Sequence, residues 1–469
     1  MLQSPADVLA EVEANGPREA TELVAGIAAA RDRPAAEIAD LRRQRARYFA
    51  TLGTAPTRFD DYLAGIIREH DDRRAYLRSV IALQSRLAFE MQPDRLVERT
   101  LALRLPDTVF LCFHVGAIAS MMVVLDPTSG LAAPHRLSFG ERQLRAIHAD
   151  FEQAQAAAAD ATTKNAALER LLSRYAELLG PSLEPYLRSL PGRQLKIFPR
   201  LQMNAVPFHA MRLQGRTLLE HCKSVSYGQT LGLFLENHAV AEATIDTALR
   251  FVIGDHVPWY GLLLPPLRQR LGAALQEETQ ADWPALRAAI AERPARDTVF
   301  ACHGHFDPAS VVDSALELSS RVDGAVSFHR LFEDLDLRGA RSVVMGSCES
   351  GLARAEVAAE YLGLPAAMLA SGVRYVIGAL WKIPQAATAV LVDRFLRATS
   401  DPAAGVADAL AQAQRELMRM RRDELAAWAS EAMGYHPGLA GTLADIAAMD
   451  ELPFAGPYHW AGLHVVGDV

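Results

Sequence analysis

The sequence predicts an α/β protein in which helices cover both faces of a mostly parallel sheet. Four short apolar runs towards the carboxyl end have the length and composition of buried strands: "LRFVIGD", "DTVFACHG", "RSVVMGSC" and "VRYVIGALW". Segments with helical periodicity, at 262–276, 283–293 and 354–371, separate most of these runs. Strands that alternate with helices favour a parallel sheet that is covered on both faces.

The composition is typical of a soluble globular protein. The chain has 469 residues, which suggests two to four domains at roughly 150 residues each. Its net charge is −8, so no overall basic field favours nucleic acid. No stretch approaches the roughly 20 apolar residues of a membrane helix, and the first residues lack the apolar core of a signal peptide. The four cysteines lie far apart without a CxxC pair, which fits a reducing cytoplasm.

Three regions follow one another along the chain. Residues 1–100 have helical spacing and form either a packing layer or a partner-binding module. Residues 101–247 predict an α/β region, with strands in "DTVFLCFHV" and "SMMVVLDPTSG" and helices over 140–178. Residues 248–469 contain the four apolar runs, a β-hairpin around Asp323-Gly324, helices at 386–399 and 402–430, and a final strand in "YHWAGLHVVGD".

Two residues that could carry chemistry follow strands of the predicted sheet. Cys348 comes after "SVVM" and His303 after "TVFA", 45 residues apart (348 − 303). Ligands of open α/β sheets bind outside the carboxyl ends of the strands, so we expect both residues at that edge. A histidine beside a cysteine favours the thiolate and can protonate a leaving amine. The backbone N–H groups of Gly304 and Cys348 could then form an oxyanion hole.

Other interpretations of these residues stay open on spacing alone. A lone cysteine in an apolar run is usually a small core residue, and Cys112, Cys222 and Cys302 fit that interpretation. Cys302 precedes His303 in a strand, so its side chain is expected on the opposite face. A metal site formed by Cys302, His303 and His305 is disfavoured because no second pair of ligands stands nearby.

Four segments resemble CHAT-domain proteins, which are caspase-like cysteine proteases of the separase, metacaspase and gingipain grouping. The segments occur in the order of that family: "TVFACHGHFDPASVVDSALELS", "LFEDLDLRGARSVVMGSCESGLA", "LPAAMLASGVRYVIGALWKI" and "GPYHWAGLHVVGD". The resemblance is strong from about 250 to 469. It continues more weakly to about 106, through "LKIFPRLQMNAVPFHAMRLQGRTLLE".

The resemblance implies a caspase-like sheet sandwiched by helices, with a degenerate first half (101–247) and an active second half (248–469). By this resemblance His303, in His-Gly-x-Phe, is the catalytic histidine, and Cys348, in Cys-Glu-Ser-Gly, is the nucleophile. Two departures are Cys302, where the family usually has threonine, and Pro384-Gln385, where acidic residues are common.

The resemblance also implies what the protein does. It implies a cytoplasmic cysteine endopeptidase that needs no metal or organic cofactor and acts on a protein substrate. A partner protein or signal would switch it on, as in prokaryotic defence systems. Nucleic acid and membrane partners are not expected, because of the net negative charge and the lack of a membrane-length apolar stretch.

Asp255, Trp381 and Glu349 are the candidates for the substrate pocket. Asp255 follows the first strand of the second half, and its carboxylate could bind an arginine or lysine before the scissile bond. The alternative is that Asp255 only caps the following turn. A pocket bounded by Trp381 would instead accept an aliphatic residue. Both preferences stay open, and cleavage after aspartate is disfavoured because no arginine stands at these strand ends.

Two other functions are compatible with the sequence. One is a CHAT-fold adaptor that binds a partner without cutting it, although a scaffold needs neither His303 nor Cys348. The other is a cysteine hydrolase of small molecules. A long, shallow strand edge rather than a closed pocket would distinguish a protease from such a hydrolase.

Overall fold

The computed structural model divides the chain into two compact units, Met1–Met91 and Gln92–Val469. The described residues are 93–103, 105, 107–158, 160–238, 245, 247–255, 257–279, 281–305, 314–319, 324–327, 330–331, 334–346, 353–355, 361–401, 403–433 and 444–467. The first unit therefore lies outside them. Of the predicted helical region 1–100, the structure describes only helix α4 (Pro93–Ala102), which extends to just past its end.

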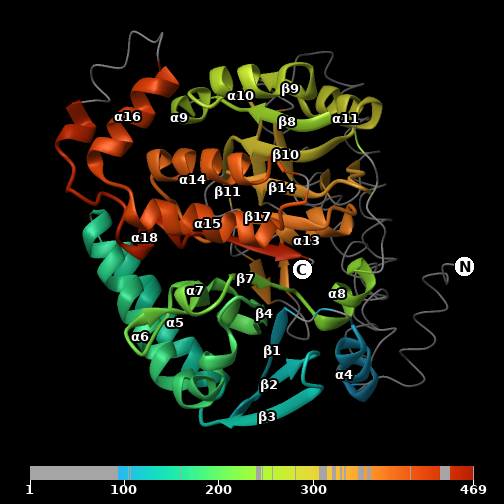
Figure 1. The fold of residues 1–469 in the computed structure, drawn as a ribbon, viewed down its shortest axis with the longest axis vertical. Coiled ribbons are helices and arrows are strands. Elements are labelled where there is room, and N and C mark those ends of the chain that lie inside the picture. Colours follow the sequence, from blue (N-terminus) through green and yellow to red (C-terminus); the bar gives the residue numbers. More distant parts are fainter. Residues whose placement is uncertain are drawn as a thin grey trace, which may run out of the picture. The chain divides into compact units, whose positions relative to one another are not determined.

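In the described part of the second unit, eleven strands form one large sheet (Figure 1). In spatial order its strands are β3 (Leu131–Leu137), β2 (Ser120–Asp126), β1 (Thr108–Val115), β4 (Gln194–Phe198), β7 (Ser224–Tyr227), β18 (Leu463–Gly467), β17 (Tyr375–Ala379), β14 (Ser342–Met345), β10 (Ala295–Ala301), β8 (Thr247–Ile253) and β9 (Leu275–Thr279). The pairs β3–β2, β2–β1 and β18–β17 are antiparallel, and the other neighbours are parallel. The predicted, mostly parallel sheet is confirmed.

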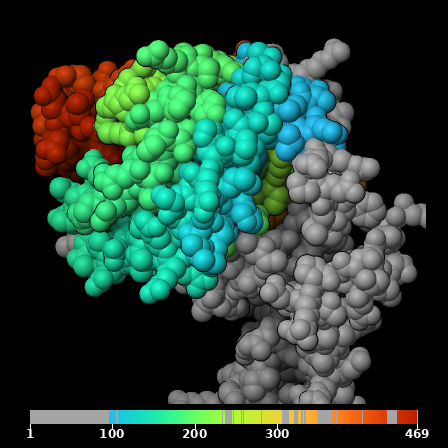
Figure 2. All heavy atoms as spheres, turned by 90° about the horizontal axis from the view of Figure 1, so that it is seen from below, coloured from blue at the N-terminus to red at the C-terminus, as the bar shows by residue number. Residues whose placement is uncertain are grey.

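Helices connect the strands along the chain and pack against the sheet. They are α5 (Glu141–Ala157), α6 (Ala161–Leu183), α7 (Leu218–His221), α8 (Leu231–His238), α9 (Pro258–Gly261), α10 (Leu264–Leu271), α11 (Trp283–Glu292), α13 (Leu364–Ala370), α14 (Gln385–Ala398), α15 (Val406–Arg419), α16 (Arg422–Met433) and α18 (Pro457–Trp460). Figure 2, seen from below, shows residues of the first half, coloured blue to green, forming a continuous face. The predicted helix 402–430 is two helices, because the chain leaves the helical conformation at Met420.

Two edge strands were not predicted from the sequence. β3 is mostly exposed and carries Pro134, a residue that sheets tolerate at an edge. β9 begins at Leu275, inside the segment 262–276 that was predicted to be helical; α10 ends earlier, at Leu271. Both strands lack the apolar run that marks the buried strands.

The predicted helix 354–371 is wrong in its first part. Short strands β15 (Ala353–Ala355) and β16 (Tyr361–Gly363) pair there in antiparallel fashion, and α13 starts only at Leu364. Pro365 gives the physical reason: it has no backbone N–H, so it is tolerated in the first turn of a helix but not in its interior.

The predicted hairpin is confirmed in its strands. β12 (Ala315–Glu317) and β13 (Ala325–Ser327) are antiparallel, and the Leu318 N–H donates to the Gly324 carbonyl at 2.7 Å. Asp323 lies outside the described residues. A third strand, β11 (His303–His305), pairs with β12 and completes a small sheet at the end of β10.

The last strand of the chain joins the two halves of the large sheet. β18 lies between β7 of the first half and β17 of the second. A buried polar network reinforces this junction: the His209 Nδ1 lies 2.8 Å from the Tyr227 hydroxyl, and the Gln414 amide donates to the Leu463 carbonyl at 2.9 Å. Burial lowers the pKa of His209 to about 3, so its ring is neutral. Strands from both sides of the predicted domain boundary, between residues 247 and 248, belong to this one sheet. The division into two halves stays a prediction.

A buried ion pair fixes β14 against β10 at their amino ends. Asp297 on β10 is 2% exposed and accepts two hydrogen bonds from Arg341, Nε to Oδ1 at 3.0 Å and Nη2 to Oδ2 at 2.7 Å. The Ser342 hydroxyl donates to the same carboxylate at 2.6 Å. Asp297 and Ser342 are also direct partners in the ladder, so these bonds specify its register.

We expect Asp297→Ala to lower the free energy of unfolding by about 3–5 kcal/mol, because it leaves the Arg341 charge buried without its partner. Urea denaturation followed by circular dichroism measures this change. The control is Asp336→Ala, since Asp336 pairs with Arg338 at 2.6 Å but both side chains are exposed (60% and 82%). Its expected cost is at most about 1 kcal/mol. Equal losses in the two variants would contradict a special role for the buried pair.

Candidate active site

The strands of the second half end together at one edge of the sheet. β8, β10, β14 and β17 are parallel neighbours, so their carboxyl ends point the same way. Their register aligns Ile253 with Ala301, Phe300 with Met345 and Val344 with Ile377. This edge is therefore the one at which the sequence places the candidate residues.

The register relates these candidates to one another by simple offsets. Phe300 and Met345 differ by 45 positions, the same offset that separates His303 from Cys348. Asp255 and His303 each follow the aligned pair Ile253 and Ala301 by two residues. Trp381 follows Cys348 by 33 positions, the offset between Val344 and Ile377. Cys348 and Glu349 themselves lie outside the described residues.

His303 is at the turn from β10 into β11. β10 ends at Ala301, and His303 begins β11, where it lies directly opposite Glu317 of β12. His303 and Gly304 are both partly buried. The predicted position of His303 just beyond the strand is therefore confirmed, while its catalytic role stays a prediction.

Gly254 allows β8 to end close to His303. A Cβ on Gly254 would lie 2.8 Å from the Cys302 Cβ and 3.0 Å from the Glu317 carbonyl oxygen, closer than side chains normally approach. The Gly254 N–H also donates to the Ala301 carbonyl at 2.9 Å. Asp255 comes directly after Gly254, and His303 directly after Cys302. The backbones at Asp255 and His303 therefore lie next to each other where β8 and β10 end, and Asp255 is half-buried.

Cys302 belongs to the core, as the sequence suggested. Its side chain is 2% exposed, and burial, reinforced by the nearby charge of Glu317, raises the pKa of its thiol to about 12. Cys222 is also buried, and burial raises its pKa to about 12 as well. Thiols this far from ionisation are neither nucleophiles nor ready metal ligands.

Trp381 lies at the same edge and is held by α18. Its ring stacks on that of Tyr458 with centroids 5.7 Å apart, and its indole Nε1–H donates to the Tyr458 carbonyl at 2.9 Å. Gly462 permits this arrangement, since a Cβ there would lie 2.9 Å from the indole. The partly exposed Trp381 can thus form a rigid wall at the edge. Sequence reasoning missed Tyr458, although "PYHW" lies in a segment that resembles the family.

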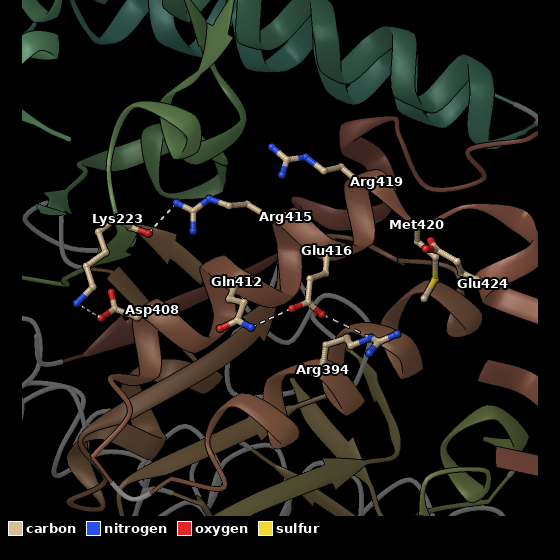
Figure 3. Close-up of a pocket in the computed structure, with 9 residues that line it drawn as sticks. All are labelled: Lys223, Arg394, Asp408, Gln412, Arg415, Glu416, Arg419, Met420 and Glu424. Carbon is tan, nitrogen blue, oxygen red and sulfur yellow. Dashed lines mark hydrogen bonds and ion pairs between the residues drawn. The ribbon is translucent and has the colours of Figure 1, made fainter. Parts of the chain in front are cut away.

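A described cavity of about 660 Å³ lies elsewhere, along α15 (Figure 3). Several of its charged groups form ion pairs: Lys223 pairs with Asp408 at 2.6 Å, and Arg394 with Glu416 at 3.6 Å. Arg415 donates to the carbonyls of the chain before β7. None of the candidate residues lines this cavity, so it gives no support to a site there.

The described part of the chain contains neither a group of side chains that could bind a metal ion nor a helix that could span a membrane. Within it, no three His, Cys, Asp or Glu side chains gather as metal ligands would. No helix in the same part has both the length and the apolar character to span a bilayer.

Comparison with known proteins gives one family and several similar structures. The CHAT domain family matches residues 169–468, which is more than half of the chain. No curated protein sequence matches. A Saccharomyces cerevisiae separase–securin complex is similar at 9% identity and a TM-score of 0.47, over 80% of this chain and 31% of that chain. A Porphyromonas gingivalis RgpB structure is similar at 8% identity and a TM-score of 0.31, over 70% and 76%.

A further similar structure is that of the Arg-specific cysteine proteinase gingipain R, at 10% identity and a TM-score of 0.33. It covers 67% of this chain and 69% of the gingipain chain. The chain spans about 31% of the matched chain of the separase complex, so its length does not represent that whole protein. The family match alone carries the assignment that follows.

We expect iodoacetamide at pH 8 to leave Cys302 and Cys222 of the native protein unmodified. Burial raises the pKa of both thiols to about 12, so at that pH they stay protonated, and their side chains are shielded from the reagent. Mass spectrometry of tryptic peptides measures the modification, and labelling in urea provides the control in which both thiols react. Modification of native Cys302 at the rate of a free thiol would contradict its assignment to the core.

Proposed function

The chain belongs to the CHAT-domain family of caspase-like proteins, and from this premise we propose that it is a cysteine endopeptidase that cuts a protein substrate. Cys348 is the nucleophile of the proposal and His303 its acid–base partner. One observation carries this assignment. The register of β10 and β14 has the same offset of 45 as the pair His303 and Cys348, so that register, extended beyond Phe300 and Met345, would bring the two positions to one level.

Gly346, which directly follows β14, supports this alignment. The Gly346 N–H donates to the Phe300 carbonyl at 2.9 Å, so the ladder continues to Gly346, two residues before Cys348. Strands paired in this way lie about 4.8 Å apart. His303 has already turned from β10 into β11, and the proposal places its imidazole within hydrogen-bond reach of the thiol that follows β14.

In the proposed reaction the chain needs only its own groups. His303 takes the proton of the Cys348 thiol, and the thiolate attacks the carbonyl carbon of the scissile peptide. The N–H groups of Gly304 and Cys348 stabilise the oxyanion that forms. His303 then protonates the amine as the C–N bond breaks, which leaves a thioester on Cys348. Water, deprotonated by His303, hydrolyses the thioester and regenerates the thiol.

Several features of this proposal rest on family membership alone. They are activation by a partner protein or signal, and a part in prokaryotic defence. The cytoplasmic location is an expectation from the four separated cysteines. The role of the helical region 1–100 as a docking surface for such a partner is likewise an expectation.

We expect Cys348→Ala and His303→Ala each to abolish cleavage, because each removes one member of the same catalytic unit. The double variant should be no worse than either single variant, since members of one unit are not additive. The assay incubates proteins encoded or purified alongside this chain with wild type and each variant, and maps new N-termini by mass spectrometry.

Cys222→Ala is the matched control, because it removes a buried thiol of the first half and should keep full activity. Cleavage by Cys348→Ala at the wild-type rate would refute the peptidase. Folded wild type that binds a partner and generates no new N-termini would favour the adaptor.

Asp255→Asn tests whether the carboxylate at the end of β8 selects the substrate. If Asp255 binds an arginine before the scissile bond, the variant should lose about 1.5–3 kcal/mol of preference for arginine, the contribution of a hydrogen bond to a charged group. A positional peptide library measures this preference in both proteins. An unchanged preference would return Asp255 to a capping role and leave the apolar pocket beside Trp381.

A further inference from the structure

Tyr260 is a buried tyrosine at the active-site edge whose hydroxyl the proposed reaction does not use. It lies on α9, the short helix that follows β8, and its side chain is 2% exposed. Its hydroxyl donates to the Gly346 carbonyl at 2.9 Å, although 86 residues separate the two in sequence. Buried tyrosines usually direct the O–H to an acceptor, and this acceptor belongs to the strand that leads to Cys348.

Gly346 is held from two sides. Its N–H donates to the Phe300 carbonyl on β10, and its carbonyl accepts from Tyr260. A Cβ on Gly346 would lie 2.3 Å from the Tyr260 hydroxyl oxygen and 2.8 Å from the ring carbon that bears it. Only glycine lets the phenol approach this closely, so the position and its partner fit each other.

The helix that carries Tyr260 is itself anchored. The Tyr260 N–H donates to the Val257 carbonyl at 3.1 Å, and the Leu263 N–H donates to the Tyr260 carbonyl at 3.0 Å. α9 also packs against α14. The hydroxyl is therefore a fixed point for the chain that passes over it.

Covalent geometry carries the effect of this hydrogen bond towards the nucleophile. A peptide group is planar, so an acceptor fixed at the Gly346 carbonyl also fixes the direction of the next N–H. Only the φ and ψ angles of Ser347 then separate the fixed peptide from the Cys348 N–H. We propose that Tyr260 is a positioning residue for Cys348, a role that rests on the proposed function and adds a residue to it.

The test compares Tyr260→Phe with a matched variant elsewhere. Tyr260→Phe removes the O–H and keeps the ring. The control, Tyr175→Phe, does the same at a fully buried tyrosine of the first half, whose hydroxyl lies 2.8 Å from the His148 Nε2. Two quantities are measured in the full chain: kcat and KM on a peptide chosen from the positional library, and the rate of Cys348 alkylation by iodoacetamide from pH 5 to 10.

We expect Tyr260→Phe to lower kcat by about tenfold and to leave KM within about twofold, because it misaligns the nucleophile without removing a substrate contact. The pH midpoint of Cys348 alkylation should rise towards that of a free cysteine, about 8.5. Tyr175→Phe should change neither quantity, even if it lowers the melting temperature by as much.

The outcomes separate this role from the proposed function. If wild type cuts no peptide but Tyr260→Phe raises the midpoint of Cys348 alkylation, the peptidase fails and the positioning role stands. If Tyr260→Phe matches wild type in alkylation and in any turnover present, the positioning role is overturned. Equal losses in the two variants would also overturn it, because they would reflect stability alone.

Discussion

The register between β10 and β14 depends on a carboxylate buried where both strands begin. Asp297 accepts two hydrogen bonds from Arg341 and one from Ser342, its own ladder partner. His303 follows Asp297 by six residues, and Cys348 follows Ser342 by six. A slip of one residue would send alternate side chains to the opposite face, so a charge pair about 20 Å away sets the register that leads towards the candidate active-site edge.

Close approaches at the other end of these strands complete the arrangement. Gly254 admits Cys302, and Gly346 admits the hydroxyl of Tyr260, at distances that a Cβ would forbid. On the far side of the edge, β18 comes from the end of the chain and places α18 against Trp381. The candidate groups thus lie at the end of a rigid sheet, where the close contacts at Gly254 and Gly346 leave no room for a larger residue. The cavity along α15 is lined by none of the candidate groups.

The strands that build this edge could be predicted from the sequence because each is a short, buried, apolar run with a clear end. The positions of His303, Asp255 and Trp381 beyond those ends follow from that pattern. The edge strands β3 and β9 could not be predicted, since β3 is mostly exposed, β9 is only partly buried, and the apolar signal of both is weak. Contacts such as Tyr260 with Gly346 join residues far apart in sequence, and no local periodicity reports them.

The juxtaposition of positions 303 and 348 is the central claim, and an engineered disulfide measures it without any substrate. In a Cys302→Ala background, His303→Cys should form an intramolecular disulfide with Cys348 under mild oxidation, because the register of β10 and β14, extended to these positions, would place their Cα atoms within the 4.4–6.8 Å that a disulfide spans. Thr279→Cys in the same background is the control, since β9 lies three strands from β14. Peptide mapping that finds the 303–348 disulfide and no 279–348 disulfide is the predicted result. Absence of the 303–348 disulfide, or equal yields from both variants, would contradict the account.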